Sequence, residues 1–149
     1  MNELFQANTI KLDLSAKNKN ECIDELIDLL YKDGILNDVS LYKKMIMERE
    51  HESSTGIGFG IAIPHAKSNA VNSSRVAIGI TKKGIDFNSP DKTLAFLIFM
   101  IAVPEGADNE HIKLLQLLSR KLIDPVFRTN LMNAKSIEEI SSYLDDIRV

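Results

Sequence analysis

Apolar and polar residues follow two different spacings in the first part of the chain. Over residues 9–14 apolar positions alternate with polar ones, which is the pattern of a half-buried strand. Over residues 23–30 the apolar positions recur every three or four residues, between the cap candidates Asn18 or Asn20 and the helix-ending Gly34. The chain is therefore expected to begin with a strand followed by a helix.

A second helix is predicted to begin near residues 37–38. Its apolar face carries Tyr42, Met45 and Ile46 at helical spacing. The next position on this face, seven residues after Tyr42, is Arg49. We therefore expect the side chain of Arg49 to point inward.

The middle of the chain begins with a predicted loop over residues 53–65, SSTGIGFGIAIPH. The segment is rich in glycine, then apolar, and is interrupted by Pro64, which lacks a backbone N–H group. The loop should lead into a short strand that ends at His65.

Further strands are predicted after this loop, over residues 75–80 and 94–103, with a short strand candidate over residues 85–87. The run 94–103 is apolar throughout, which is typical of a strand buried on both faces. These strands should frame a central sheet.

The last part of the chain is predicted to be helical. After the final strand, apolar residues recur at helical spacing, and Asp108 as N-cap would place His111 in the first turn. Asp124 followed by Pro125 predicts the start of a short helix, and Ser136 begins a capping box before the last one.

Length and composition favour one compact domain over residues 1–149. The chain is 44% hydrophobic and 26% charged, which suits a single globular core. Strands mixed with helices of these lengths predict an α/β fold. We expect a three-layer α/β/α sandwich with a mixed central sheet and helices on both faces.

Charge and cysteine content narrow the class of function. The net charge of −3 gives no broad basic face, so nucleic acid is not expected as a partner. The single cysteine, Cys22, cannot form an internal disulfide, and its apolar neighbours predict that its side chain is buried. Both observations suit a protein of a reducing compartment. The N-terminus lacks the pattern of a signal peptide, and the longest apolar run is half of what a membrane helix needs. A cytoplasmic protein without direct membrane insertion is expected.

The glycine-rich loop is a candidate for supporting a phosphate. Closely spaced glycines let backbone amides approach a ligand or adopt positive φ, and they could equally serve turn geometry alone. The spacing fits neither GxGxxG nor a P-loop, so a nucleotide site is not indicated. The residues assigned to this phosphate-supporting loop are Thr55, Gly56, Gly58 and Gly60.

His65 is the candidate nucleophile. An imidazole with a pKa of about 6.5 is mostly neutral at pH 7 and can take a phosphoryl group reversibly on a ring nitrogen. Arg49 offers a planar fork of N–H donors for phosphoryl oxygens, although it could also complement a helix C-terminus. His111 could donate to a phosphoryl oxygen, orient the ring of His65, or have no role. His51 is expected to face solvent.

No metal or cofactor is expected. The histidines show neither HxH nor HExxH spacing. A hydrolase would need a positioned base and water, for which no constellation is evident.

Three segments together closely resemble a known family. They are STGIGFGIAIPHAKS with RE upstream, MIAVPEGADNEHIKLLQLLSRKL, and DPVFRTNLMNAKS. In this combination and order they resemble the IIA component of the fructose and mannitol class of the bacterial phosphoenolpyruvate-dependent sugar phosphotransferase system. The resemblance runs nearly end to end.

The resemblance implies specific roles. His65 matches the family's phosphoacceptor, through Nε2, with HPr as donor and the cysteine of a IIB domain as recipient. Arg49 matches the phosphate-side arginine, and His111 matches the second active-site histidine. The chain has no IIB or IIC portion, so a free-standing IIA protein is expected.

Two functions remain open on this basis. The first is a phosphocarrier in sugar uptake, of the fructose type. The second is a regulatory binding module of the nitrogen-regulatory IIA branch, in which phosphorylation of His65 controls docking to a kinase, channel or transcription factor. Both branches share STGIG and IAIPH.

Overall fold

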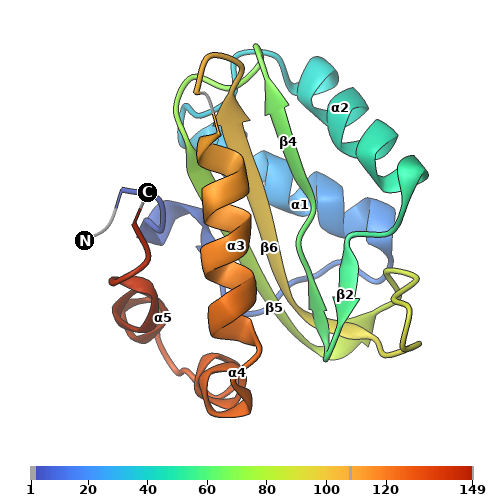
Figure 1. Cartoon of the computed structure of the whole chain (residues 1–149), viewed down its shortest axis with the longest axis vertical. Coiled ribbons are helices and arrows are strands. Elements are labelled where there is room, and N and C mark those ends of the chain that lie inside the picture. The colour runs from blue at the N-terminus through green and yellow to red at the C-terminus, as the bar shows by residue number, and fades with distance from the viewer. Residues whose placement is uncertain (1–2, 108, 149) are drawn as a thin grey trace.

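The computed structural model describes residues 3–107 and 109–148 of the chain, which form a central sheet with helices on both faces (Figure 1). The strands are β1 (Ile10–Lys11), β2 (Gly56–Gly58), β3 (Ile61–Ala62), β4 (His65–Ser68), β5 (Arg75–Ile85) and β6 (Ala95–Pro104). The helices are the 3₁₀ turn η1 (Ala7–Thr9), α1 (Lys19–Lys32), α2 (Val39–Glu52), α3 (Glu110–Leu122), α4 (Pro125–Met132) and α5 (Ile137–Leu144).

The sheet is mixed, as predicted. Its order is β1-β5-β6-β3-β2, and β4 also pairs with β6. β1 runs parallel to β5, β5 runs antiparallel to β6, and both β3 and β4 run parallel to β6. Among the described residues β4 pairs with β6 alone, so it lies at an edge, where Figure 1 shows it between α2 and α3.

Away from His65, two strand predictions were wrong in their boundaries. The first strand is only β1, although the Leu14 amide still donates to the Ile80 carbonyl at 2.9 Å. β5 continues past Ile80 and ends at Ile85, so the separate strand expected over 85–87 does not form. A register shift between Ile80 and Ile85, with Gly84 at a φ of 82°, lets the strand bend and continue.

The helix starts follow side-chain capping. Asn18, Asp38, Asp124 and Ser136 each accept a hydrogen bond from a backbone amide in the first turn of the helix that follows. At the N-cap of α3 the structure has Asn109, while the predicted cap Asp108 lies outside the described residues. Within the described ranges, no helix has the length and apolar character needed to cross a membrane.

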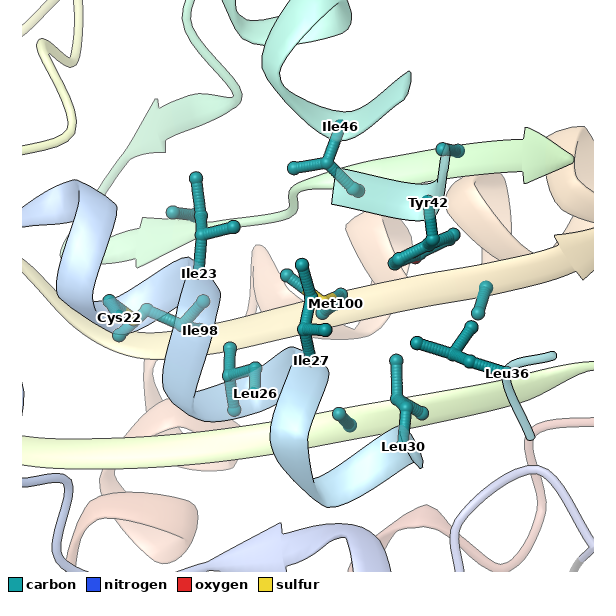
Figure 2. Packing of buried hydrophobic residues seen from close by; sticks show 14 of the residues in the cluster. Cys22, Ile23, Leu26, Ile27, Leu30, Leu36, Tyr42, Ile46, Ile98 and Met100 are labelled. Carbon is teal, nitrogen blue, oxygen red and sulfur yellow. The ribbon is translucent and has the colours of Figure 1, made fainter. Parts of the chain in front are cut away.

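Two hydrophobic clusters lie on the two faces of the sheet. Ile98, Met100 and Ala102 of β6 pack with α1 and α2, and Figure 2 shows Ile98 and Met100 beneath these helices. The alternate β6 residues Phe99 and Ile101 pack with α3, α4 and α5. The predicted burial of this strand on both faces and the predicted three-layer sandwich are both confirmed.

Cys22 belongs to the cluster under α1 and is fully buried (Figure 2). Burial, with a smaller contribution from the charge of Glu25, raises the pKa of its thiol to about 12. The thiol is therefore protonated at neutral pH.

Helix α2 is held on the sheet by a row of residues at four-residue spacing. Tyr42, Ile46 and Glu50 are its buried positions, and the Tyr42 hydroxyl donates to the Ile101 carbonyl at 3.1 Å. Arg49 is half-buried at the flank of this row. The buried position expected for Arg49 belongs instead to Glu50, which continues the four-residue spacing of Tyr42 and Ile46.

A buried ion pair joins the end of α1 to the start of β5. Arg75 is 8% exposed and its Nη1 donates to Asp33, which also accepts from Asn8 Nδ2 at 3.0 Å. Burial acts to raise the pKa of Asp33, but the hydrogen bonds from Asn8 and Arg75 and the charge of Arg75 outweigh it. The pKa of Asp33 therefore lies below its usual value.

We expect Asp33→Asn to lower the free energy of unfolding by about 3 kcal/mol at pH 7, because it leaves the buried guanidinium without a counter-charge. Because the folded pKa is depressed, the carboxylate stabilises the fold above about pH 4 and loses this effect as pH falls further. Urea unfolding at pH 7 and pH 3 measures both.

The matched control is Asp28→Asn, since the Asp28–Lys32 pair (2.8 Å) is exposed. That variant should change the free energy of unfolding by about 0.5 kcal/mol or less. Equal losses in the two variants, or a loss for Asp33→Asn that is independent of pH, would contradict the assigned role of the buried pair.

Candidate functional site

His65 stands at a break in the edge strand. β3 ends at Ala62, and His65 is the first residue of β4, so the expectation that it ends a strand was wrong. Ala62 pairs with Ile98 and His65 with Ile101, and the register along β6 is unchanged across the break. The Pro64 carbonyl accepts from the Ile101 amide at 2.9 Å, so the chain rejoins the ladder at once.

The imidazole of His65 is fixed by its own backbone neighbourhood. Nδ1 lies 2.8 Å from the carbonyl oxygen of Ile63. A carbonyl oxygen can only accept, so Nδ1 carries the proton and Nε2 carries the lone pair. The hydrogen bond therefore selects the tautomer in which Nε2 is the nucleophilic nitrogen.

A cavity of about 430 Å³ opens between α2, β4 and α3. It is lined by His65, Arg49 and His111, so the structure brings together the three residues that the sequence singled out. The other lining residues are Met45, Glu48, Glu52, Ala66, Lys67, Ile112 and Leu115.

Arg49 has two relationships at once. Its Nη1 donates to the carbonyl oxygen of Ser53 at 2.8 Å and lies 3.3 Å from the Ser53 hydroxyl oxygen. The guanidinium therefore caps the C-terminus of α2. Within the part of the chain that the structure describes, these are its hydrogen bonds, and the guanidinium also lines the cavity. Helix capping and a place at the site are therefore compatible.

His111 is in the first turn of α3, as predicted. Its Nδ1 is buried and has no hydrogen-bond partner among the described residues. A buried ring nitrogen without a partner is costly and calls for an explanation. An oxygen of a group bound in the cavity would supply the partner.

The surroundings of His65 favour its neutral form. Burial is the largest cause that lowers its pKa, and the positive charges of Arg49 and His111 lower it further. The hydrogen bond with Ile63 and the charge of Glu50 act in the opposite direction without overcoming this. The pKa of His65 therefore lies below 6.5.

The glycine-rich loop lies apart from the cavity. Gly58 (φ 88°) and Gly60 (φ 79°) form the turn between β2 and β3. Ile61 pairs with Leu97, four positions before the partner of His65 on β6, so this turn lies roughly 13 Å from His65 along the strand. No residue of the loop is among the described residues that line the cavity.

The other two loop residues are packed inside the protein. A side chain at Gly56 would meet the Ser89 hydroxyl at 2.3 Å, so glycine is needed there for close packing. Thr55 is buried, and its hydroxyl donates to Glu50. The side chains of this loop therefore do not line the cavity, and the loop is connected to His65 only through the backbone.

Two charged residues of this region went unnoticed in the sequence. Lys67 lines the cavity and shares a face of β4 with His65, as the two-residue period of a strand requires. Glu50 follows Ile46 by four residues on the buried row of α2. The strand and helix periods were the signals that could have found them.

Comparison with known proteins gives a consistent family. The family model described as "Phosphoenolpyruvate-dependent sugar phosphotransferase system, EIIA 2" matches residues 3–147. The chain is 46% identical over 138 residues to the fructose-specific EIIABC component of Bacillus subtilis, covering 93% of this chain but only 22% of that protein. It is 37% identical to the fructose-specific EIIA component of Haloferax volcanii, covering 93% and 90% of the two chains.

Solved structures share the fold. The nitrogen regulatory protein IIA-Ntr from Neisseria meningitidis superposes with a TM-score of 0.88 at 32% identity, covering 95% of this chain and 97% of that one. The mannitol IIA enzyme of Escherichia coli, solved in complex with phosphorylated IIB, gives a TM-score of 0.80 at 26% identity, covering 94% and 96%.

We expect an NMR titration of the His65 ring to give a midpoint below 6.5, because burial and the neighbouring cations disfavour the imidazolium. Because the folded pKa is depressed below the unfolded value of about 6.5, the stability linked to neutral His65 is complete above about pH 6.5 and is lost as pH falls through the lower folded pKa. Arg49→Met should raise the midpoint, since it removes one cation. A midpoint of 6.5 or higher in the unmodified protein would contradict this description.

Proposed function

The chain belongs to the EIIA 2 family of the phosphoenolpyruvate-dependent sugar phosphotransferase system, and from this premise we propose that it is a cytoplasmic phosphocarrier acting through His65. It takes a phosphoryl group from phospho-HPr onto Nε2 and passes it to a IIB protein or domain. The observation that carries the proposal is the hydrogen bond between Nδ1 and the Ile63 carbonyl, which leaves the Nε2 lone pair for attack at a cavity.

The transfer follows from the tautomer. The Nε2 lone pair attacks phosphorus, a P–N bond forms at His65, and the bond to the donor breaks with its electron pair returning to the donor. Nδ1 keeps its proton and its hydrogen bond throughout. In the second step the thiolate of a IIB cysteine attacks phosphorus, and the P–N electron pair returns to Nε2.

Groups on three elements stabilise the negative charge of the phosphoryl group. Arg49 on α2 provides charge-assisted hydrogen bonds of about 1.5–3 kcal/mol each, and Lys67 on β4 adds a cation at the cavity. The amides at the start of α3 contribute roughly 0.3–1 kcal/mol. The buried Nδ1 of His111 gains an acceptor when a phosphoryl oxygen arrives. Arginine is the largest contribution.

The loop of Thr55, Gly56, Gly58 and Gly60 supports the phosphoryl group indirectly in this proposal. Its glycines shape the β2–β3 turn and allow close packing, and Thr55 anchors the backbone before His65.

The sugar proposed is fructose. The two relatives at 46% and 37% identity are both named fructose-specific components. The chain spans about a fifth of the Bacillus protein, so the fructose specificity of that whole protein is extended to this chain only as part of the proposal.

A second candidate is supported by the likeness to IIA-Ntr, with its TM-score of 0.88. In that function the phosphorylation state of His65 controls docking to a regulatory partner, with no onward transfer.

Incubation with phosphoenolpyruvate, enzyme I and HPr should add one acid-labile, base-stable phosphoryl group, because a phosphoramidate hydrolyses in acid. His65→Ala should abolish the label, while His51→Ala, at an exposed position, should retain it. Intact mass and peptide mapping measure the label. Label that survives in His65→Ala would refute the assignment. Transfer of the phosphoryl group from the labelled protein to a fructose IIB protein supports the role in sugar uptake. A phosphoryl group that remains on this protein and changes its affinity for a regulatory partner supports the second candidate.

Arg49→Lys should fold normally but slow acceptance about ten-fold or more, because an ammonium keeps the charge and loses the fork geometry. Loss of about 1.4 kcal/mol of transition-state stabilisation corresponds to one decade in rate. Single-turnover transfer from phospho-HPr, beside a thermal melt, measures the two effects. Unaltered transfer would leave Arg49 with only its helix-capping role at Ser53.

A further inference from the structure

The carboxylate of Glu50 is buried at the C-terminal end of α2, behind the site. Its side chain is 4% exposed, and it accepts from Lys19 Nζ at 3.1 Å. It also accepts from the Thr55 hydroxyl and lies 3.4 Å from the Thr55 amide nitrogen. A buried carboxylate must be paired in this way, and here the pairing joins α1, α2 and the loop before β2.

A hydrogen-bonded path leads from this carboxylate to the ring of His65. The carbonyl oxygen of Thr55 accepts from the Ile63 amide at 2.9 Å. The carbonyl oxygen of Ile63 accepts from Nδ1 of His65 at 2.8 Å. Both backbone polar groups of Ile63 are thus committed, one to Thr55 and the other to the imidazole.

Ile63 lies in the break between β3 and β4, where the sheet ladder does not set its orientation. The residue after it is Pro64, which restricts Ile63 to extended conformations, so the direction of the Ile63 carbonyl follows the orientation of the whole residue. The hydrogen bond that the Ile63 amide donates to the Thr55 carbonyl is therefore the contact that orients this residue.

We propose that Glu50 and Thr55 are positioning residues that fix the tautomer of His65 through Ile63. They touch neither the phosphoryl group nor the donor protein. Glu50 holds Thr55, Thr55 holds Ile63, and the Ile63 carbonyl keeps the proton of His65 on Nδ1. The inference rests on the proposed phosphocarrier function for its effect on rate, but the tautomer itself is a property of the resting protein.

The geometry of Thr55 separates this role from direct phosphate binding. Its hydroxyl hydrogen is committed to Glu50, and the residue is 3% exposed. Lys19 is the ion-pair partner of Glu50, and its Nζ also lies 5.4 Å from the centroid of the Phe87 ring. The cluster is therefore a support for the site that is closed off from the cavity.

The decisive variants are Thr55→Val and Thr55→Ser. Valine keeps the shape and loses the hydroxyl, whereas serine keeps the hydroxyl that reaches Glu50. ¹⁵N NMR of the His65 ring at pH 8 distinguishes a protonated Nδ1 from a protonated Nε2. Hydrogen exchange of the Ile63 amide and single-turnover acceptance from phospho-HPr are measured on the same samples.

In the unmodified protein and in Thr55→Ser, the proton should reside on Nδ1. In Thr55→Val and in Glu50→Gln, a population with the proton on Nε2 should appear and Ile63 exchange should accelerate. Acceptance should fall roughly three- to ten-fold, in proportion to the competent tautomer. Asp33→Asn is the control for lost stability, since it breaks a buried pair elsewhere, and it should leave the ring spectrum and the acceptance rate unchanged.

Glu50 could instead act on His65 through its charge, together with Arg49, His111 and Lys67 around the ring. Glu50→Gln would then move the pH profile of acceptance while the proton stayed on Nδ1, and this result would overturn the proposal. A proton that stays on Nδ1 with full acceptance in Thr55→Val would overturn it as well, even if Glu50→Gln did not fold. If the unmodified protein accepted no phosphoryl group, the proposed function would fail, and the ring spectra would still decide the tautomer question.

Discussion

The apolar character of β6 on both faces is the constraint on which the rest of the molecule depends. Ile98 and Met100 need cover on one face, and Phe99 and Ile101 need it on the other, so helices must lie on both sides. α2 and α3 consequently sit on opposite faces with the edge strand β4 between their ends. The cavity at His65 is the place where these three elements meet, and no single element could have built it.

Periodicity and capping predicted most of the fold. The helices begin where Asn18, Asp38, Asp124 and Ser136 cap them, because capping depends on residues within one turn. The strand ends were less accessible to prediction. The extension of β5 depends on a register shift against β6, and the start of β4 at His65 depends on pairing with Ile101. Pairing partners that distant in the sequence leave no local signal.

The same distinction applies to the site. His65, Arg49 and His111 were identifiable from their chemistry and from the family resemblance, and they do line one cavity. Glu50 was not predicted as a site residue, because a glutamate beside Arg49 is expected to be exposed unless it has a partner. The helix period places it on the buried row, but the Thr55 hydroxyl that makes burial of its carboxylate possible is brought to it only by the tertiary fold. The position of the glycine turn, far along the strand from His65, is likewise a tertiary property.

The burial of the Cys22 thiol has a consequence for assays of the proposed phosphoryl transfer to a IIB partner. Its pKa of about 12 and its complete burial keep it from acting as a nucleophile toward alkylating reagents while the protein is folded. In the proposed function, a phosphoryl group on His65 therefore has no competing thiolate within the described part of this chain. In an assay that contains only this protein and a IIB partner, a thiol reagent would react with the unphosphorylated cysteine of the partner and not with Cys22. The extent of labelling would therefore measure how much of the partner's cysteine is free.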